Sequence, residues 1–595
     1  MLKAFALLVV FLFLSSIFTA PVGDEGVARA AAGPSPFGQP TKVNDNSANE
    51  QVAPVIIALP GHGLFMVWQD GRAGYYGIYS SSSFDNGTNW SANKRVDDPA
   101  FNTSTPRNPA VAVTKNGTIM LVWQDNRRNT FDYDIFFAKS YNHGTTFTKN
   151  MKVSDGPAGS WQERPAIAVT LAGGVYIAWT DDRTGIQRVR GAVSSDMGLT
   201  FSASKEMVPS GTGGETGVSL ATYGNIIYAA FMDNVTRRTA HPFSCTSTNG
   251  GKSFNTPHRL DSTGRRGSPM NGVTIAPMPS GGFVAAWEDT RNGAPDIYIS
   301  SVAADGSFII SDLRVEDDSS YDYSWQDNPS VTVDQFGNFF VAWQDERTTG
   351  YPAIRLAFLK TGRVQFNASV EVAKPGLQDM QMMPSVVSLG PGQVFAAYQD
   401  DKGGTDDVFV AAGTFPNLYG LTLASGFNFV TVYCEGPQGK GYKASTLGLA
   451  KGDMVFGWNS SRGSYDQYFI VGVSPQSSDF QINNSTGYWI FTNAQESIEL
   501  KGNVPTTKQT KKVVVPGGGS WVSLGFASLN SSRRASDVPG LFTVAGGVTA
   551  VSSFDTVMGV YSSYIVGLPQ TDFKLTPGKA YWCWVKTSGS FNYYP

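Results

Sequence analysis

Two stretches of the sequence combine aromatic side chains with carboxylates and amides, a combination that suits the binding of sugars. Sugar rings stack their CH-rich faces on aromatic rings, while carboxylates and amides orient the hydroxyl groups. The candidate ligand-binding residues are Trp161, Glu163 and Arg164 in the first stretch, and Tyr323, Trp325 and Asp327 in the second. The alternative interpretation is structural, with Trp161 and Trp325 filling gaps between neighbouring units of the fold. We expect both stretches to lie in loops.

A second motif places a carboxylate and a guanidinium two residues apart, and it recurs five times. The pairs are Asp70 with Arg72, Asp125 with Arg127, Asp181 with Arg183, Asp289 with Arg291, and Asp345 with Arg347. One interpretation is a ring of alternating charge that binds polar ligands. The other is a repeated ion pair, local or between units, that fixes a turn, since bidentate pairing suits a repeated geometry. Near-identical repetition favours the structural interpretation, because a ligand site needs residues that differ between units.

The sequence contains no spacing of histidines or cysteines that is typical of a metal or cofactor site. The four histidines and three cysteines are scattered, so neither a histidine-based zinc site nor a disulfide framework is expected. We therefore assign no metal ligand and no cofactor. Acidic loops at Glu316, Asp317 and Asp318, and at Asp406 and Asp407, carry the oxygen ligands that Ca²⁺ prefers. A structural Ca²⁺ stays open there, with solvated surface charge as the simpler interpretation.

These motifs sit on an internal repeat that predicts the fold. An apolar run ending in an aromatic residue, then any residue, then aspartate, occurs seven times at intervals of 52 to 56 residues. The aromatics are Trp68, Trp123, Trp179, Phe231, Trp287, Trp343 and Tyr398. A second marker, usually proline, stands fourteen residues before each aromatic. Each unit holds four short alternating segments, for example 110–113, 118–123, 134–138 and 147–153. Seven four-stranded units are typical of an all-β, seven-bladed β-propeller.

The ends of the repeat predict how the ring closes. Fourth segments tend to end in Val-x-Asp, and the same ending occurs at Val43-Asn44-Asp45, before the first unit. The seventh unit lacks a fourth segment after 407–412. We therefore predict that residues 40–43 pair into the last blade and close the ring, which also removes two free sheet edges.

The turn between third and fourth segments carries Ser-x-Asp-x-Gly-x-x-aromatic. The clearest copies contain Asp85, Gly87 and Trp90, and Asp196, Gly198 and Phe201. The carboxylate is expected to accept hydrogen bonds from backbone N–H groups of a tight turn, while glycine supplies a positive φ. Over about residues 37–415 the sequence thus resembles the sialidase-like propeller superfamily, whose Asp boxes, or BNR repeats, have this pattern.

The resemblance implies a function without fixing the activity. In sialidase-like propellers the boxes lie opposite the active site, which uses three arginines, a tyrosine nucleophile helped by glutamate, and an aspartate acid/base. The family's arginine motif at the opening strand is absent, since that strand reads Ala53-Pro54-Val55-Ile56. We therefore assign no catalytic residue and favour a non-catalytic propeller that binds glycans or surface proteins. The alternatives are an exo-glycosidase of sialidase type acting on terminal sugars of glycoconjugates, and a structural envelope component.

The remaining sequence predicts location and further domains. Residues 1–30 resemble a cleavable secretory signal, with an uncleaved anchor as the alternative, and no second apolar stretch predicts a membrane span. We expect a secreted protein, with attachment to the cell surface left open. The net charge of −3 argues against nucleic-acid binding. Two stretches that align at an offset of 93 residues predict tandem β-sandwich-like domains over 416–503 and 504–595.

Overall fold

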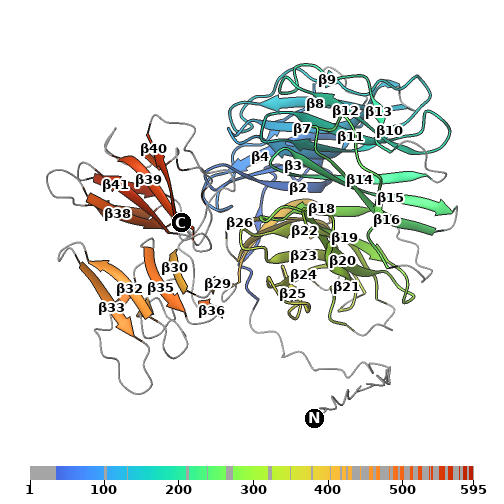
Figure 1. Cartoon of the computed structure of the whole chain (residues 1–595). Coiled ribbons are helices and arrows are strands. Elements are labelled where there is room, and N and C mark those ends of the chain that lie inside the picture. The colour runs from blue at the N-terminus through green and yellow to red at the C-terminus, as the bar shows by residue number, and fades with distance from the viewer. Residues whose placement is uncertain are drawn as a thin grey trace, which may run out of the picture.

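The computed structural model describes residues 35–415 with short gaps, and beyond them mainly the strands of the C-terminal third. The gaps are 99–103, 130–131, 209–213, 237–238, 263–271, 319–323, 377–378 and the single positions 349, 391 and 403. The predicted signal at 1–30 lies outside the described residues. Residues 35–415 form seven four-stranded antiparallel sheets, which we number as blades 1 to 7 (Figure 1).

Each blade follows the chain from its first to its fourth strand, apart from the last. Blades 1 to 3 consist of β2 (Gln51–Leu59), β3 (Gly63–Asp70), β4 (Gly77–Ser83) and β5 (Lys94–Arg95); β6 (Arg107–Val113), β7 (Ile119–Asn129), β8 (Asp132–Ser140) and β9 (Met151–Lys152); and β10 (Gln162–Val169), β11 (Val175–Asp181), β12 (Arg188–Ser194) and β13 (Lys205–Glu206). Blades 4 and 5 consist of β14 (Glu215–Tyr223), β15 (Ile226–Thr236), β16 (Thr239–Ser247) and β17 (His258–Arg259); and β18 (Val273–Pro277), β19 (Phe283–Asp289), β20 (Asp296–Val302) and β21 (Phe308–Arg314). Blades 6 and 7 consist of β22 (Gln326–Val333), β23 (Phe339–Asp345), β24 (Ala353–Leu359) and β25 (Val370–Glu371); and β26 (Gln381–Gly390), β27 (Gln393–Asp400), β28 (Asp407–Thr414) and β1 (Thr41–Lys42).

The seven blades form a closed ring. The first strands contact one another in the cycle β2, β6, β10, β14, β18, β22, β26 and back to β2, so they surround the central axis. One hydrophobic cluster fills each of the seven interfaces between neighbouring blades, including the interface between blades 7 and 1. Each sheet therefore buries both faces only because the ring is complete. This confirms the predicted propeller.

The N-terminal strand closes the ring as predicted. β1 pairs with β28 through Thr41 with Val410 and Lys42 with Phe409, and so supplies the fourth strand of blade 7. The next residue, Val43, is 3 % exposed and packs in the cluster between blades 7 and 1. The last blade is therefore built from both ends of the repeat region.

Replacing Val43 with alanine is expected to lower the free energy of unfolding of the propeller by about 2 kcal/mol. The substitution leaves a cavity at the seam that joins the two ends of the ring. The shift can be measured as the urea midpoint of tryptophan fluorescence. Replacing the exposed Gln39 with alanine serves as the control, and equal midpoints for the two variants would show that the seam does not limit stability.

The boundaries of the short strands differ from the sequence prediction. In blade 2 the fourth strand covers only Met151–Lys152, whereas the alternation predicted 147–153. Before it, Thr148 binds β8 at Lys139, with its backbone N–H as donor and its side-chain hydroxyl as acceptor, so a side chain takes the place of one backbone partner there. The first strand begins at Arg107 instead of 110, with a register shift between Arg107 and Ala110. This bulge recurs in other blades and bears on the functional site.

The Asp-box turns have the predicted geometry. Asp85 accepts a hydrogen bond from the backbone of Asn89 at 2.9 Å, and Gly87 has φ 76°. Asp196 likewise accepts a hydrogen bond from the backbone of Thr200 at 2.9 Å. These contacts satisfy the N–H groups of the turn. Gly198 has φ 74°, as the turn requires. The aromatic residues of the boxes also make contacts: the indole N–H of Trp90 donates to the carbonyl of Gly87, and Phe201 packs edge-on against Phe137 of blade 2.

The C-terminal third contains two four-stranded sheets with the same strand connectivity. The first has the order β30 (Gly426–Thr431), β35 (Gly487–Thr492), β32 (Met454–Asn459) and β33 (Ser464–Phe469). The second has the order β38 (Ser520–Gly525), β41 (Ala580–Val585), β39 (Val548–Asp555) and β40 (Val560–Ile565). The shorter pairs are β29 (Tyr419–Leu423) with β36 (Glu496–Leu500), β31 (Tyr442–Lys443) with β34 (Gln481–Ile482), and β37 (Gln509–Val513) with β42 (Gly589–Tyr593). The domain limits 416–503 and 504–595 and their sandwich packing stay predictions.

Candidate functional site

The two ends of the blades carry different motifs. Asp boxes occupy the turns between third and fourth strands. The loops between second and third strands lie at the other end, together with the connections that enter each first strand. We call this second surface the loop face. All candidate ligand-binding residues that the structure describes lie on it.

The repeated aspartates and arginines form ion pairs at the loop face. The five aspartates are at most 2 % exposed, and each binds the arginine two residues later. In four blades the buried indole N–H also donates to the aspartate, as Trp343 does to Asp345 at 2.8 Å. These residues therefore hold the loop in place, and the alternative of a ligand-binding ring of alternating charge is not supported by this geometry.

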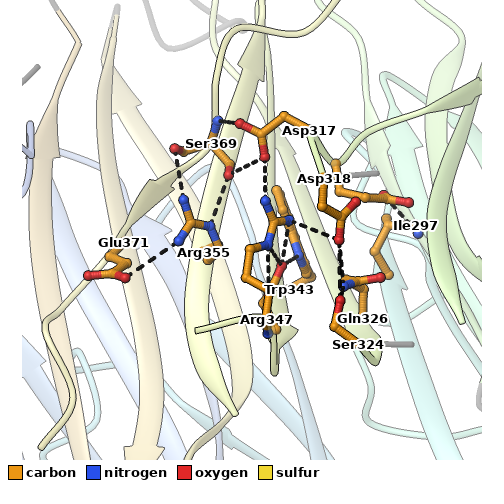
Figure 2. Close-up of polar contacts among 12 residues, drawn as sticks. Ile297, Asp317, Asp318, Ser324, Gln326, Trp343, Arg347, Arg355, Ser369 and Glu371 are labelled. Atoms are coloured by element: carbon orange, nitrogen blue, oxygen red, sulfur yellow. Dashed lines mark hydrogen bonds and ion pairs between the residues drawn. The ribbon is translucent and has the colours of Figure 1, made fainter. Parts of the chain in front are cut away.

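Four of the five arginines also join neighbouring blades. Arg347 of blade 6 binds Asp317, which follows the last strand of blade 5, at 2.7 Å (Figure 2). Asp317 in turn accepts a hydrogen bond from the backbone of Ser369, at the start of the fourth strand of blade 6. Arg72 binds Asp45 and Arg183 binds Asp155 in the same way. In these cases the Val-x-Asp ending of one blade is the partner of the arginine in the next, whereas Arg291 binds Asp312 of its own blade.

The acidic loop before blade 6 was expected to be solvated surface charge, and this expectation was wrong. Glu316 is 3 % exposed and binds Arg314 at 2.7 Å. Asp318 also binds Arg314, at 2.8 Å. With Asp317 bound to Arg347, these carboxylates are paired with arginine rather than solvated.

A second contact between blades uses the glutamine inside the Trp-x-Asp motif. In five blades, the residue just before the first-strand proline has φ between 49° and 53°, a strained conformation for a residue with a Cβ atom. Its backbone N–H donates to a glutamine or glutamate of the preceding blade at 2.8–3.0 Å. The donors are Ala53, Asn108, Arg164, Asn328 and Met383, and their acceptors are Gln399, Gln69, Gln124, Glu288 and Gln344. The side chains at these bulges differ from blade to blade.

At blades 1 to 3 the bulges line a cleft with a volume of about 480 Å³. Its lining residues are Val52, Gln69 and Tyr76 of blade 1, Arg107, Asn108, Gln124 and Tyr133 of blade 2, and Trp161, Glu163 and Arg164 of blade 3. Gln124 anchors the floor, since its amide oxygen accepts hydrogen bonds from the side chain of Asn108 and the backbone of Arg164, both at 2.8 Å.

The cleft contains three of the six predicted ligand-binding residues. Trp161 is 47 % exposed and packs edge-on against Tyr133 at 5.9 Å between ring centroids, so it does not fill a gap between blades. Glu163 and Arg164 lie in strand β10 rather than in a loop, because the first strand begins before the bulge.

Of the other three predicted residues, the two that the structure describes do not line the cleft. Trp325, which is 46 % exposed, and Asp327 belong to blade 6, and Asp327 lies in strand β22 instead of a loop. Burial raises the pKa of Asp327 to about 6, with the charge of Glu346 acting in the same direction. Tyr323 lies outside the described residues.

Sequence reasoning missed Tyr76, Arg107, Asn108 and Tyr133 as parts of the site. A usable signal existed for two of them. When the repeats are aligned on their prolines, Arg107 takes the position of Glu163, and Asn108 takes that of Arg164. Tyr76 and Tyr133 carry no repeated marker, so only the fold brings them to the cleft.

A tyrosine and a glutamate meet beside the cleft. The hydroxyl of Tyr76 donates a hydrogen bond to the carboxylate of Glu50, and the guanidinium of Arg107 lies 5.5 Å from the centre of the Tyr76 ring. Burial and the bond to Glu50 raise the pKa of Tyr76 to about 12. The phenol is therefore neutral at physiological pH and needs a base to become a nucleophile. No tyrosine–glutamate pair was assigned from the sequence, so this pair is a finding of the structure.

Blade 4 departs from the repeated pattern on the loop face, where its first strand begins and its motif aspartate lies. Glu215 stands where four other blades have a buried glutamine opposite the motif aspartate, and it pairs in register with Asp233. Val235 replaces the arginine, which leaves the buried Oδ1 of Asp233 without a hydrogen bond. Burial raises the pKa of Glu215 to about 7, although Arg188 lies 3.5 Å away, and the pKa of Asp233 is also raised by burial.

The described residues contain no group of three or more histidine, cysteine or acidic side chains placed to bind a metal ion. Within the same part of the chain, no helical segment has the length and apolar character needed to cross a bilayer. The structural Ca²⁺ that the sequence left open at the acidic loops stays a prediction.

Comparisons with known proteins give distant structural likenesses only. No family model and no curated protein matches the sequence. A protein of unknown function from Dyadobacter fermentans is 13 % identical over 64 % of this chain and 98 % of its own, with a TM-score of 0.40. The α-L-arabinofuranosidase Arb93A from Fusarium graminearum is 11 % identical over the same shares, with a TM-score of 0.40. An ulvan lyase of polysaccharide lyase family 25 is 11 % identical over 63 % of this chain and 96 % of its own, with a TM-score of 0.43.

These likenesses are too distant to carry an argument about function. The class of fold rests on the chain itself, which has seven four-stranded blades, a ring closed by the N-terminal strand, and Asp boxes opposite the loop face. By fold, residues 35–415 form a seven-bladed β-propeller with Asp-box turns.

Proposed function

We propose that this protein is a recognition propeller that binds an acidic saccharide in the cleft of blades 1 to 3. The observation that carries the proposal is which arginines form ion pairs and which do not. Among the propeller arginines that the structure describes, all but Arg107, Arg164 and Arg363 form ion pairs with carboxylates. Two of these three, both exposed, line one cleft. Guanidinium groups without a protein partner suit a carboxylate or sulfate of the ligand.

The rest of the cleft suits a sugar ring. Trp161 and Tyr133 offer aromatic surface for the CH face of a pyranose, and Asn108 and Glu163 offer hydrogen-bonding groups for hydroxyls. Gln69 holds the backbone of the strained bulge at Asn108, and Gln124 holds the side chain of Asn108 and the backbone of the bulge at Arg164, so this part of the cleft is pre-organised before binding. Action outside the cell remains part of the proposal, supported by the signal-like N-terminus.

Replacing Arg164 with alanine is expected to weaken binding of acidic oligosaccharides about tenfold or more, because a charge-assisted hydrogen bond contributes about 1.5–3 kcal/mol. A glycan array selects the ligand, and isothermal titration calorimetry at two salt concentrations measures its affinity. Arg107→Ala should behave in the same way and also reduce the dependence of affinity on salt.

The matched control is Arg363→Ala, which removes an exposed arginine that lies away from the cleft, in the turn after the third strand of blade 6. The proposal fails if neutral oligosaccharides bind as tightly as acidic ones, or if all three variants bind like the wild type.

Hydrolysis of an acidic glycoside is the second candidate function. The observation in its favour is the hydrogen bond from Tyr76 to Glu50 beside Arg107 and the cleft. Glu50 would act as the base that activates Tyr76, the roles that the sialidase-like resemblance implies. Fluorogenic sialosides and uronides test it. Turnover that is lost in Tyr76→Phe, while binding persists, would establish the enzyme, and no turnover by the wild type would leave binding as the function.

A further inference from the structure

Blades 3 and 6 share a five-residue pattern that the other blades lack. It reads Trp-Gln-acid-x-Pro, at 161–165 and at 325–329. In the five blades that keep the proline, the residue four positions before it is Glu50, Thr105, Trp161, Trp325 or Met380. Only blades 3 and 6 therefore place an aromatic residue at this point of the loop face.

The two tryptophans have equivalent surroundings. Trp161 is 47 % and Trp325 46 % exposed, and the glutamine that follows each one is fully buried. The carbonyl of Trp161 accepts a hydrogen bond from the backbone of Asp182 at 3.2 Å, and that of Trp325 accepts one from Glu346 at 3.1 Å. Both donors belong to the loop that follows the second strand of the same blade. Each ring is thus presented to solvent by the same backbone device, on the same face.

The two positions differ in charge. At blade 3 the tryptophan is accompanied by the unpaired guanidinium of Arg164. At blade 6, Asn328 takes the place of Arg164, and Arg347 and Arg355 are bound to carboxylates. The third arginine of that blade, Arg363, lies at the opposite end, after the third strand. Among the described residues, Asp327 and Glu346 are carboxylates near Trp325 in the fold that form no ion pair. This surface can accept hydrogen bonds from hydroxyls, but it repels a carboxylate or sulfate.

An aromatic ring and a carboxylate occur together at the blade 6 position. Trp325 is half exposed, and Asp327 follows it by two residues in strand β22. The backbone N–H of Asn328 donates to Glu288 of blade 5, so this bulge is held in the same way as the bulge at Arg164, which donates to Gln124 of blade 2. An aromatic ring and a carboxylate on a fixed backbone fit the apolar face and hydroxyls of an uncharged sugar.

We propose that Trp325 and Asp327 form a second subsite, for an uncharged sugar residue, and that the ligand is a polysaccharide extending across the loop face from blade 3 to blade 6. This inference rests on the proposed function of the cleft. Blades 3 and 6 stand three sectors apart in a ring of seven, so a short oligosaccharide held at one position leaves the other empty. A chain that engages both gains affinity through the high effective concentration of its second residue.

The test compares polymers with their fragments. Hyaluronan and unsulfated chondroitin both alternate an acidic residue with an uncharged N-acetylated residue, and each is titrated as the long polymer and as the tetrasaccharide. Trp325→Ala is expected to lower the affinity for the polymers about tenfold and to change that for the tetrasaccharides less than twofold. Trp161→Ala is expected to weaken the binding of both. Leu199→Ala, which removes a 65 % exposed side chain on the Asp-box face, is the control.

Three results would overturn the inference. Polymer binding that is unchanged in Trp325→Ala removes the second subsite. Equal losses for polymer and tetrasaccharide in that variant place Trp325 in the same subsite as Trp161. Wild-type affinity that is no higher for the polymers than for the tetrasaccharides removes the extended ligand. In contrast, an absence of binding to every acidic oligosaccharide, long or short, would defeat the proposed function itself.

Discussion

Replacing Arg347 with methionine is expected to lower the free energy of unfolding of the propeller by about 3–5 kcal/mol. Methionine retains much of the volume but removes the cation that binds Asp345 within the blade and Asp317 from the preceding blade (Figure 2). Asp345 is 1 % exposed, so its charge would stay buried with only hydrogen bonds to compensate it. Urea unfolding followed by tryptophan fluorescence measures the loss.

Two variants separate the buried charge from other effects. Arg363→Met removes an exposed arginine that has no ion pair and should change the free energy of unfolding by less than about 0.5 kcal/mol. Adding Asp345→Asn to Arg347→Met should restore part of the loss, because the uncompensated charge disappears. A single variant as stable as the control would mean that the repeated ion pairs contribute nothing to the joints between blades.

Replacing Glu215 with glutamine is expected to make the propeller more stable than the wild type by about 3 kcal/mol at pH 8 and equally stable at about pH 4, below the unfolded pKa. Four other blades have glutamine at this position, and in blade 7 the amide of Gln381 donates to Asp400 at 3.0 Å. Glu215 can donate to Asp233 in that manner only when it is protonated. Burial raises its pKa from 4.5 to about 7 in the folded protein.

The sign follows from proton binding. Between pH 4.5 and 7 the folded protein binds more protons at Glu215 than the unfolded chain does, so the wild type loses stability as the pH rises through this range. Glutamine has no such loss. Other buried carboxylates with raised pKa values, such as Asp334 and Asp406, titrate equally in both proteins and cancel in the difference. Parallel stability curves from pH 5 to pH 8 would contradict the assignment to Glu215.

The repeated features of this propeller could be read from the sequence because they are local and periodic. The spacing of Trp68, Trp123 and their equivalents predicted the seven blades, and the pairing of β1 with β28 confirmed the predicted closure. The Asp boxes have the expected turn geometry because a carboxylate, a glycine and an aromatic within six residues fix that turn by themselves. Strand limits were less accurate, since bulges and turn side chains decide where pairing begins.

The site was decided by contacts between blades, which no single repeat contains. The sequence identified Trp161, Glu163 and Arg164, but the neighbours Tyr76, Arg107 and Tyr133 come from other blades and join them only when the ring is closed. The same holds for the role of the arginines. From the sequence alone, Arg347 could bind a ligand or hold the fold. Its ion pair with Asp317, thirty residues away in the preceding blade, assigns it to the fold. Exposure is likewise a property of the assembled fold, because whether Trp161 and Trp325 fill a gap or face solvent depends on how closely the neighbouring blades pack.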